Sequence, residues 1–510
     1  MKVRFVTLGC KLNFAESSAL GKELLLRGHQ RASLQEVPDV CVVNTCSVTD
    51  TADHKDRQTI NQLHRKYPNA IIIVTGCYAQ LQPEQVSQIE GVDYVLGQNE
   101  KYEIPKLVAT LESDAAKAAI GRAKPYGVSD ATLLGDTPTP DIRHHAQNKI
   151  QVGAIREVDE FHGVHSADDR TRCFIKVQDG CNYFCSYCTI PYARGKSRNP
   201  KISEVVADAK QALEQGAKEL IITGVNIGDF GRSTGESFID LLKALDSLET
   251  PMRHAARNLN KSFCNDSDCI ATAPHFGNIQ NATAESSVNE ARGDGREGDE
   301  VMRREGEEAR RQEIGYRIRI SSCEPNLLTD EIIDFVAKSK HFAPHFHIPL
   351  QSGSNEILKI MGRRYTRELF ADRVRHIKEV MPDAFIGVDC MVGVRGETQE
   401  YWEDYLAFIK ELDVSQLHVF TYSERANTRM LEMDLCVVPQ AERKRRSKIL
   451  HAVSEEKTKN FYEKHAGRKA VVLWESKKEG EQMAGFTDNY IKVYGPYDKT
   501  KVNTFEAIII

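Results

Sequence analysis

Three cysteines stand close together near the middle of the chain, in the run Cys181-Asn182-Tyr183-Phe184-Cys185-Ser186-Tyr187-Cys188. Their C-x3-C-x2-C spacing provides three thiolates, one fewer than the four irons of a cubane iron–sulfur cluster. The fourth iron would stay open for an exogenous ligand, as one coordination position does at a catalytic zinc. A zinc knuckle or a disulfide would need a further Cys or His nearby, and the twenty residues after Cys188 contain none. The spacing therefore predicts a cluster with one open iron.

Three further cysteines, Cys10, Cys46 and Cys77, each fall one or two residues past a β-rich run in the first 110 residues. These runs alternate with helix-like stretches, which is typical of a doubly wound parallel sheet. Loops at the carboxyl ends of parallel strands converge on one crevice, so the three thiols are predicted to meet there as a second three-thiolate site. The alternative is that three small residues occupy tight turns. The expected strands are residues 3–8, 40–44, 70–75 and 92–96, with helices at 13–27 and 53–66.

Residues 171–440 contain six β-rich runs separated by helical stretches. Six units are too few for a closed eight-unit barrel, so we expect an open (β/α)6 partial TIM barrel with the Cys181 loop on the face that carries barrel chemistry. A charged stretch at 249–315 interrupts it and is predicted to be a disordered insertion. Its Cys264 and Cys269 could bind a metal, but we interpret them as two cysteines of a disordered segment. Residues 111–170 are interpreted as an irregular linker. The six runs are residues 173–177, 219–223, 316–321, 345–349, 385–389 and 416–420.

The composition is that of an ordinary soluble protein, with 41% hydrophobic and 28% charged residues. No apolar run is long enough to span a bilayer and no signal peptide is evident, so the sequence predicts a cytoplasmic protein without a membrane partner. The net charge is −5, but residues 441–510 hold fifteen Lys and Arg against ten Asp and Glu. That basic end indicates a polyanionic partner.

The basic end is predicted to be a long helix followed by a small, five-stranded OB-like β-barrel. Aromatic and lysine side chains in it favour a surface that stacks on bases and neutralises phosphates, although a capping barrel without a ligand is the alternative. Arg194 and Arg198 have three open interpretations: a cofactor carboxylate, RNA phosphate or a solvated loop. His345 and His347 alternate about Phe346 and are interpreted as structural. The aromatic and lysine residues are Trp474, Phe486, Tyr490, Tyr494, Lys469, Lys477, Lys478 and Lys492.

The Cys181 motif, with Tyr187 before its last cysteine, resembles the signature of radical S-adenosylmethionine (radical SAM) enzymes. The strings Thr7-Leu8-Gly9-Cys10-Lys11-Leu12-Asn13, Val43-Asn44-Thr45-Cys46-Ser47 and Thr75-Gly76-Cys77-Tyr78 resemble the N-terminal domain of the methylthiotransferases. Gly485-Phe486-Thr487-Asp488-Asn489-Tyr490 resembles the hairpin of the TRAM domain that ends the RNA-modifying members. Within the family, the sequence is most similar to those of the bacterial enzymes that act on threonylcarbamoyladenosine. Thr421 and Ala426-Asn427 depart from the usual residues, while all six cluster cysteines are intact.

This resemblance implies two [4Fe-4S] clusters and S-adenosylmethionine as cofactors. The cluster on Cys181, Cys185 and Cys188 would split S-adenosylmethionine to give a 5′-deoxyadenosyl radical, and the auxiliary cluster on Cys10, Cys46 and Cys77 would hold the sulfur to be inserted. The resemblance also implies cofactor contacts after the barrel strands. Those residues are Tyr187, Gly224, Asn226, Gln351, Ser352, Gly387 and Gly393.

The implied reaction adds a methylthio group to C2 of N6-threonylcarbamoyladenosine at position 37 of the tRNA anticodon loop. The implied partners are tRNA, an electron donor such as flavodoxin or ferredoxin, and a sulfur source. Alternative substrates are isopentenyladenosine in tRNA and a ribosomal-protein aspartate. A different class is a non-catalytic iron–sulfur protein that binds RNA, but binding alone has no use for two incomplete ligand sets.

Overall fold

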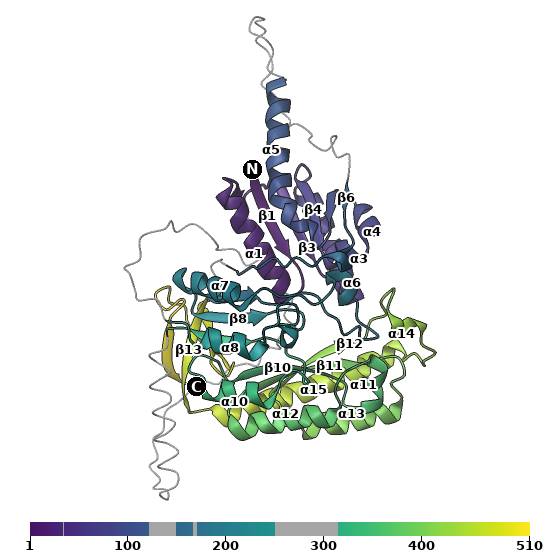
Figure 1. Cartoon of the computed structure of the whole chain (residues 1–510), viewed down its shortest axis with the longest axis vertical. Coiled ribbons are helices and arrows are strands. Elements are labelled where there is room, and N and C mark those ends of the chain that lie inside the picture. Colours follow the sequence, from purple (N-terminus) through teal and green to yellow (C-terminus); the bar gives the residue numbers. More distant parts are fainter. Residues whose placement is uncertain (34, 122–148, 167–170, 250–314) are drawn as a thin grey trace, which may run out of the picture.

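The computed structural model describes residues 1–33, 35–121, 149–166, 171–249 and 315–510. Most of the predicted insertion, with Cys264 and Cys269, lies outside these ranges. Within them, every helix is too short or too polar to cross a membrane. Figure 1 shows the N-terminal sheet above the barrel strands, with the C-terminal strands at one end of the barrel.

The N-terminal domain is a six-stranded parallel sheet in the order β2-β1-β3-β4-β5-β6. Helices α1 and α5 cover one face through Leu20 and Ile104, and α2 covers the other through Ile60. The predicted doubly wound sheet is therefore confirmed. The strands are β1 (Lys2–Thr7), β2 (Gln30–Arg31), β3 (Val40–Thr45), β4 (Ile71–Gly76), β5 (Val92–Leu96) and β6 (Ile150–Gln151). The helices are α1 (Lys11–Leu26), α2 (Asp50–Lys66), α3 (Cys77–Leu81), α4 (Pro83–Ser87), η1 (Glu100–Glu103) and α5 (Ile104–Gly121).

The stretch predicted as an irregular linker is partly regular, which corrects that interpretation. Helix α5 continues to Gly121, and β6 adds a sixth strand to the N-terminal sheet beside β5. The sequence missed β6 because a two-residue strand leaves no periodic pattern. The chain thus returns to the first domain before it enters the barrel.

Six parallel strands form the barrel as two three-stranded sheets, β7-β8-β9 and β10-β11-β12. Two isolated parallel bridges, Ile318 to Phe342 and Ser322 to His347, join the sheets, so the predicted open arc of six strands is confirmed. The strands are β7 (Arg172–Lys176), β8 (Glu219–Thr223), β9 (Arg317–Ile320), β10 (His345–Gln351), β11 (Phe385–Val392) and β12 (Gln416–Thr421). The helical elements are η3 (Ile155–Glu157), α6 (Ile190–Arg194), α7 (Ile202–Glu214), η4 (Ile227–Asp229), α8 (Phe238–Asp246), α10 (Asp330–Lys338), α11 (Asn355–Met361), α12 (Arg367–Val380), α13 (Gln399–Glu411) and α14 (Arg429–Glu432).

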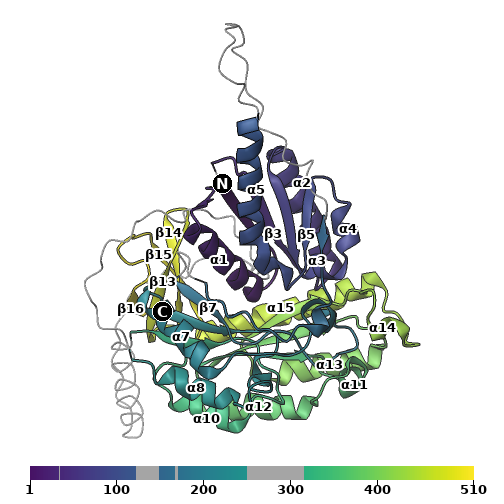
Figure 2. The ribbon, with the colours of Figure 1, turned by 45° about the horizontal axis from the view of Figure 1, so that its top comes forward.

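The two faces of these strands differ in chemistry because alternate residues of a strand point to opposite sides. The outward set, such as Ile175, Ile222 and Ile348, packs into one large apolar core under the helices. The inward set is largely charged or polar. Helix α1 covers the inward face of β7 and β8 (Figure 2). The rings of Phe14 and Phe174 meet there edge to face, with their centroids 5.8 Å apart. The inward polar residues are Arg172, Lys176, Glu219, Arg317, Arg319, His345, His347, Asp389 and His418.

The C-terminal domain begins with α15 (Gln440–His465), which packs along β12. Four antiparallel strands follow in the order β15-β14-β13-β16, so the small β domain is confirmed but has four strands rather than five. It packs against the starts of the barrel strands, where the Arg319 guanidinium donates to the Thr487 carbonyl at 2.7 Å. The strands are β13 (Lys469–Glu479), β14 (Gln482–Thr487), β15 (Lys492–Pro496) and β16 (Phe505–Ile509).

That docking turns most of the predicted base-stacking residues away from solvent. Trp474 and Phe486 are buried, and Tyr490 stacks on Phe486 while its hydroxyl accepts from Arg172 at 3.4 Å. Of the four aromatics, Tyr494 alone is largely exposed, beneath the Lys492 ammonium. The basic start of α15 is also partly occupied, since two of its arginines are buried in ion pairs with barrel carboxylates, Arg443 with Glu424 and Arg446 with Glu397.

Candidate active site

The first cysteine trio lies where three neighbouring strands of the N-terminal sheet end. Cys10 caps α1 after β1, Cys46 follows β3, and Cys77 opens α3 after β4. The preceding glycines permit this close approach: Gly9 has φ +95°, and a Cβ on it would lie 2.6 Å from the Cys46 Cβ. Gly76 has φ +100°, and a Cβ there would lie 2.4 Å from the Thr45 carbonyl oxygen. The chain therefore brings the three loops together as the strand pattern predicts.

The three thiols influence one another. Burial raises the pKa of Cys46, and the nearby Cys77 and Cys10 raise it further. Burial also raises the pKa of Cys77, whose sulfur accepts from Gln98 Nε2 at 3.2 Å. The backbone N–H of Cys46 donates to Asp56 at 3.0 Å, and burial raises the pKa of that carboxyl to about 8. The sequence missed Gln98 and Asp56 because neither stands at a ligand-like spacing.

The second trio lies on the loop after β7. The Cys188 N–H donates to the Cys185 carbonyl at 3.0 Å, which curls the loop. Burial raises the pKa of Cys181 to about 11 and that of Cys188 to about 12, with neighbouring thiols adding to both shifts. Arg363, from the turn after α11, donates to the Cys185 sulfur at 3.2 Å and to the Tyr187 hydroxyl at 3.3 Å. A cation therefore faces these sulfurs, and its distance along the chain explains why the sequence gave no signal for it.

The loops that carry the two trios meet at the interface between the domains. Helix α3, which starts at Cys77, packs against α6, which follows Cys188 (Figure 1). The Thr189 hydroxyl, next to Cys188, donates to the Ser47 carbonyl, next to Cys46, at 3.5 Å. The Arg425 side chain, after β12, donates to the Ser47 hydroxyl at 2.6 Å and so connects the last strand of the barrel to the same loop.

A buried ion network joins the domains beside the trios. Arg194 Nη1 lies 3.1 Å from Glu16 of α1 and 3.0 Å from Asp179 of the barrel. Lys101 and Lys176 also reach Glu16, at 2.5 and 3.0 Å. All five side chains are nearly fully buried. These cations outweigh desolvation and hold the Glu16 pKa well below its usual range. Arg194 is thus neither a solvated loop residue nor an RNA contact, which corrects two of the three interpretations for it.

Among the predicted cofactor contacts, Asn226 has the clearest place for a ligand. It is 3% exposed, yet neither atom of its side-chain amide has a hydrogen-bond partner in the described residues. A buried amide without a partner is costly unless a ligand or water satisfies it. Gln178 Oε1 accepts the N–H groups of Val225 and Asn226 at 2.9 and 2.7 Å, and a Cβ on Gly224 would lie 2.8 Å from the Gln178 carbonyl oxygen. This cradle fits a small polar cofactor.

The remaining predicted contacts have neighbours within the chain. Gln351 adopts φ +65°, and the buried Ser352 hydroxyl accepts from the Ser354 N–H at 3.2 Å. A Cβ on Gly387 would lie 3.2 Å from His418 Nε2, and one on Gly393 would lie 2.3 Å from the Arg443 Cγ. Packing within the chain therefore constrains both glycines.

The donor chemistry suits clusters better than single ions. In the described ranges, no three His, Cys, Asp or Glu side chains are placed to hold one metal ion. A cubane makes no such demand, because each thiolate binds a different iron. Three mutually influencing thiols without a fourth ligand fit a cubane with an open iron at each site.

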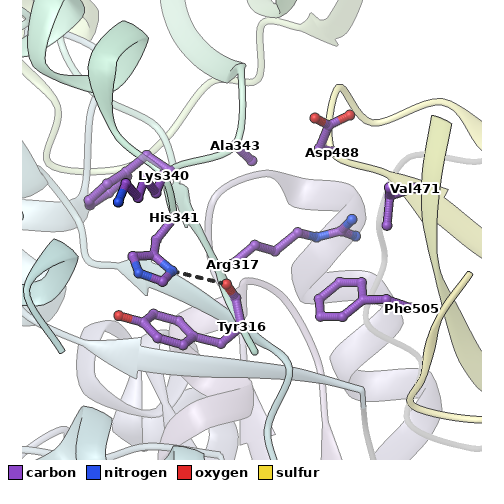
Figure 3. Close-up of a pocket in the computed structure, with 9 residues that line it drawn as sticks. Tyr316, Arg317, Lys340, His341, Ala343, Val471, Asp488 and Phe505 are labelled. Atoms are coloured by element: carbon purple, nitrogen blue, oxygen red, sulfur yellow. Dashed lines mark hydrogen bonds between the residues drawn. The ribbon is translucent and has the colours of Figure 1, made fainter. Parts of the chain in front are cut away.

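Two cavities lie at opposite ends of the barrel. A polar cavity of about 330 Å³ opens between α2 and the loop after β12, on the cysteine side, with Asp53 and Arg425 in its lining. A cavity of about 40 Å³ lies at the other end, between the barrel and the C-terminal strands. Figure 3 shows Arg317 there, pointing toward Phe505 and Asp488. Neither cavity is lined by a predicted site residue, but the larger one lies beside the Cys46 loop, because Arg425 in its lining donates to Ser47. The cysteine side is therefore the candidate active site.

Comparisons with known proteins identify the family of the chain. The "Uncharacterized protein family UPF0004" matches residues 2–97, and the radical SAM superfamily matches residues 175–252 and 292–409. Threonylcarbamoyladenosine tRNA methylthiotransferase MtaB of Bacillus subtilis (strain 168) is 32% identical over 96% of this chain and 89% of its own length. The tRNA-2-methylthio-N(6)-dimethylallyladenosine synthase of Desulfitobacterium hafniense (strain Y51) is 25% identical over 100% of this chain and 94% of its own. The structure of the radical S-adenosylmethionine methyltransferase TsrM of Kitasatospora setae is similar with a TM-score of 0.44 and 15% identity, covering 82% of this chain and 75% of that one. By full-length identity to the Bacillus protein, the chain belongs to the threonylcarbamoyladenosine tRNA methylthiotransferase family of radical SAM enzymes.

Proposed function

We propose that this chain converts N6-threonylcarbamoyladenosine at position 37 of tRNA into its 2-methylthio derivative. The observation that carries the proposal is the meeting of two three-cysteine loops across one domain interface, joined by α3 on α6 and by the Thr189–Ser47 hydrogen bond. When bound, the clusters and S-adenosylmethionine would supply radical generation, sulfur and a methyl group. An inert C–H carbon needs such a pair of sites, since acid–base chemistry does not reach it.

The chain's own residues would bind and orient these groups. Cys181, Cys185 and Cys188 would hold the cluster that binds S-adenosylmethionine, and Cys10, Cys46 and Cys77 the auxiliary cluster. Asn226, with Gly224 beside it, would satisfy polar atoms of S-adenosylmethionine, and Tyr187 would keep Arg363 beside Cys185. Gln351 and Ser352 remain candidate contacts, and Gly387 and Gly393 are the weakest ones because their neighbours are internal.

Further partners follow from this chemistry. We expect the tRNA anticodon loop to enter at the interface between the domains, an electron donor such as flavodoxin or ferredoxin to reduce the cluster, and a separate sulfur source to reload the auxiliary site. A cytoplasmic location follows from a tRNA substrate.

Mass spectrometry of tRNA nucleosides from a deletion strain tests the substrate. Loss of 2-methylthio-N6-threonylcarbamoyladenosine is expected, with recovery on re-expression of the intact chain. Loss of the methylthio derivative of isopentenyladenosine, or of the modified ribosomal-protein aspartate, would instead identify one of the alternative substrates. The non-catalytic class predicts that reconstituted protein treated with dithionite and S-adenosylmethionine forms no 5′-deoxyadenosine.

A further inference from the structure

The inner face of the barrel is covered on one side and accessible on the other. Over β7 and β8 it lies beneath α1, where Phe174 is buried against Phe14. On β10 to β12 the inward residues remain partly accessible. The exposed fraction is 22% for the His347 side chain, 16% for the Asp389 side chain and 37% for Phe420. A substrate that enters the barrel therefore meets β10, β11 and β12.

The most exposed of these residues is an aromatic one, Phe420, the last residue but one of β12. The preceding Val419 packs into the apolar core outside the barrel, so the Phe420 ring points inward. Among the described aromatic side chains only Phe420 and Tyr494 are exposed, and Tyr494 belongs to the C-terminal domain. No other ring and no cation in the described ranges stacks on Phe420. A free aromatic face is therefore presented to the inside of the barrel.

The loop that follows Phe420 contacts both cysteine loops. On the side of the first trio, the Asp50 N–H donates to the Ser423 hydroxyl at 3.1 Å. On the side of the second trio, the Met430 N–H donates to the Ser186 carbonyl at 2.8 Å. Three residues of extended chain span about 11 Å, so Phe420 lies close to the contact that Ser423 makes. The free aromatic face is thus placed where the loops of the two trios meet.

We propose that the Phe420 ring stacks on the adenine at position 37 of the tRNA and so positions C2 of that base between the two trios. The inference rests on the proposed function, in which one carbon of the base must be reached from both trios. Enzymes that modify a base take it out of the stack and hold it against aromatic side chains, and single-stranded RNA loops are recognised in the same way. Phenylalanine has no hydrogen-bonding group, so it would fix the plane of the base and leave the N6 substituent to other residues.

Binding of anticodon stem-loop RNAs to anaerobically reconstituted protein, without S-adenosylmethionine, tests this. Two RNAs are compared, one with N6-threonylcarbamoyladenosine at position 37 and one with an abasic nucleotide there. Phe420→Ala should weaken binding of the intact RNA about 5- to 150-fold, the size of one lost base–aromatic stack, and leave binding of the abasic RNA unchanged. Tyr494→Ala removes the other exposed aromatic side chain and is the matched control, which should not change the ratio of the two affinities.

Phe420→Trp reports the stacking directly. It should bind the intact RNA at least as tightly as wild type does, because an indole offers a larger face. The two native tryptophans, Trp402 and Trp474, are buried, so the exposed indole of the variant should dominate any change in fluorescence. That fluorescence should be quenched by the intact RNA and not by the abasic RNA.

The remaining outcomes decide between this inference and others. If Phe420→Ala weakens both RNAs equally, the ring contacts another nucleotide and the proposal is wrong. If it instead weakens binding of S-adenosylmethionine in equilibrium dialysis, the ring contacts that cofactor and the proposal is also wrong. If Phe420→Ala loses iron, the fluorescence of Phe420→Trp decides. If wild type binds intact and abasic RNA equally well, the proposed function fails, whereas a wild-type preference that Phe420→Ala keeps overturns this inference alone.

Discussion

Replacing Arg194 by Met should loosen the contact between the N-terminal domain and the barrel. The guanidinium is 1% exposed and donates to Glu16, Asp179 and Asn13. Removing one member of a buried ion pair costs roughly 3–5 kcal/mol because the partner charge stays buried. Here Lys101 and Lys176 still neutralise Glu16, so we expect the lower end, about 3 kcal/mol.

Hydrogen exchange followed by mass spectrometry measures this change locally. A loss of about 3 kcal/mol corresponds to roughly a 100-fold larger open fraction, so peptides from α1 and α6 should exchange that much faster while those from α12 do not change. Arg194→Lys should be intermediate, because it keeps the charge but not the fork of donors. Arg445→Met is the matched control, since Arg445 is an exposed partner of Glu442 and such pairs contribute little. Unchanged exchange in α1 and α6 of Arg194→Met would show that the network does not hold the domains together.

Three further predictions concern the clusters and the barrel interior. The triple variant Cys181→Ala/Cys185→Ala/Cys188→Ala should contain about four irons where wild type contains about eight, and an anaerobic iron and sulfide determination decides it. Gly76→Ala should lower the iron content of the auxiliary site on Cys10, Cys46 and Cys77. Gly76 has φ +100°, and a Cβ there would lie 2.4 Å from the Thr45 carbonyl oxygen, so the substitution should displace the Cys77 loop. An iron content equal to that of wild type would contradict this. Burial lowers the pKa of His418 in the folded protein to about 4, whereas in the unfolded chain it is about 6.5. The unfolded chain therefore takes up this proton at higher pH, and the free energy of unfolding should decrease as the pH falls from 6.5 toward 4. His418→Gln should fall less steeply in urea denaturation of the apoprotein over that range, and an unchanged slope would refute the assignment.

Much of the architecture was predictable because local patterns determine it. Cys10, Cys46 and Cys77 follow strands of a parallel sheet, and that topology requires their loops to converge. The six barrel strands were found for a similar reason, since their buried outward faces leave apolar runs.

Contacts between distant parts of the chain were not predictable. Arg363 reaches Cys185 across 178 positions, and no spacing rule connects them. None of the three interpretations of Arg194 was a contact between domains, because α1, which buries it, lies far away in the sequence. The aromatics of the C-terminal domain were misjudged for the same reason, since alternation identifies two faces of a strand but not which of them another domain covers.

Helix α1 contributes to both the N-terminal domain and the inner face of the barrel. It belongs to the N-terminal domain and its N-cap residue is Cys10. Its Phe14 nevertheless packs against Phe174 on the inner face of the barrel. Any movement of α1 that opens the barrel to an RNA loop must therefore carry Cys10 with it. Entry of the nucleic acid and the position of the first cysteine trio are mechanically linked, so an enzyme with α1 tethered to β7 would retain its iron but exclude large substrates.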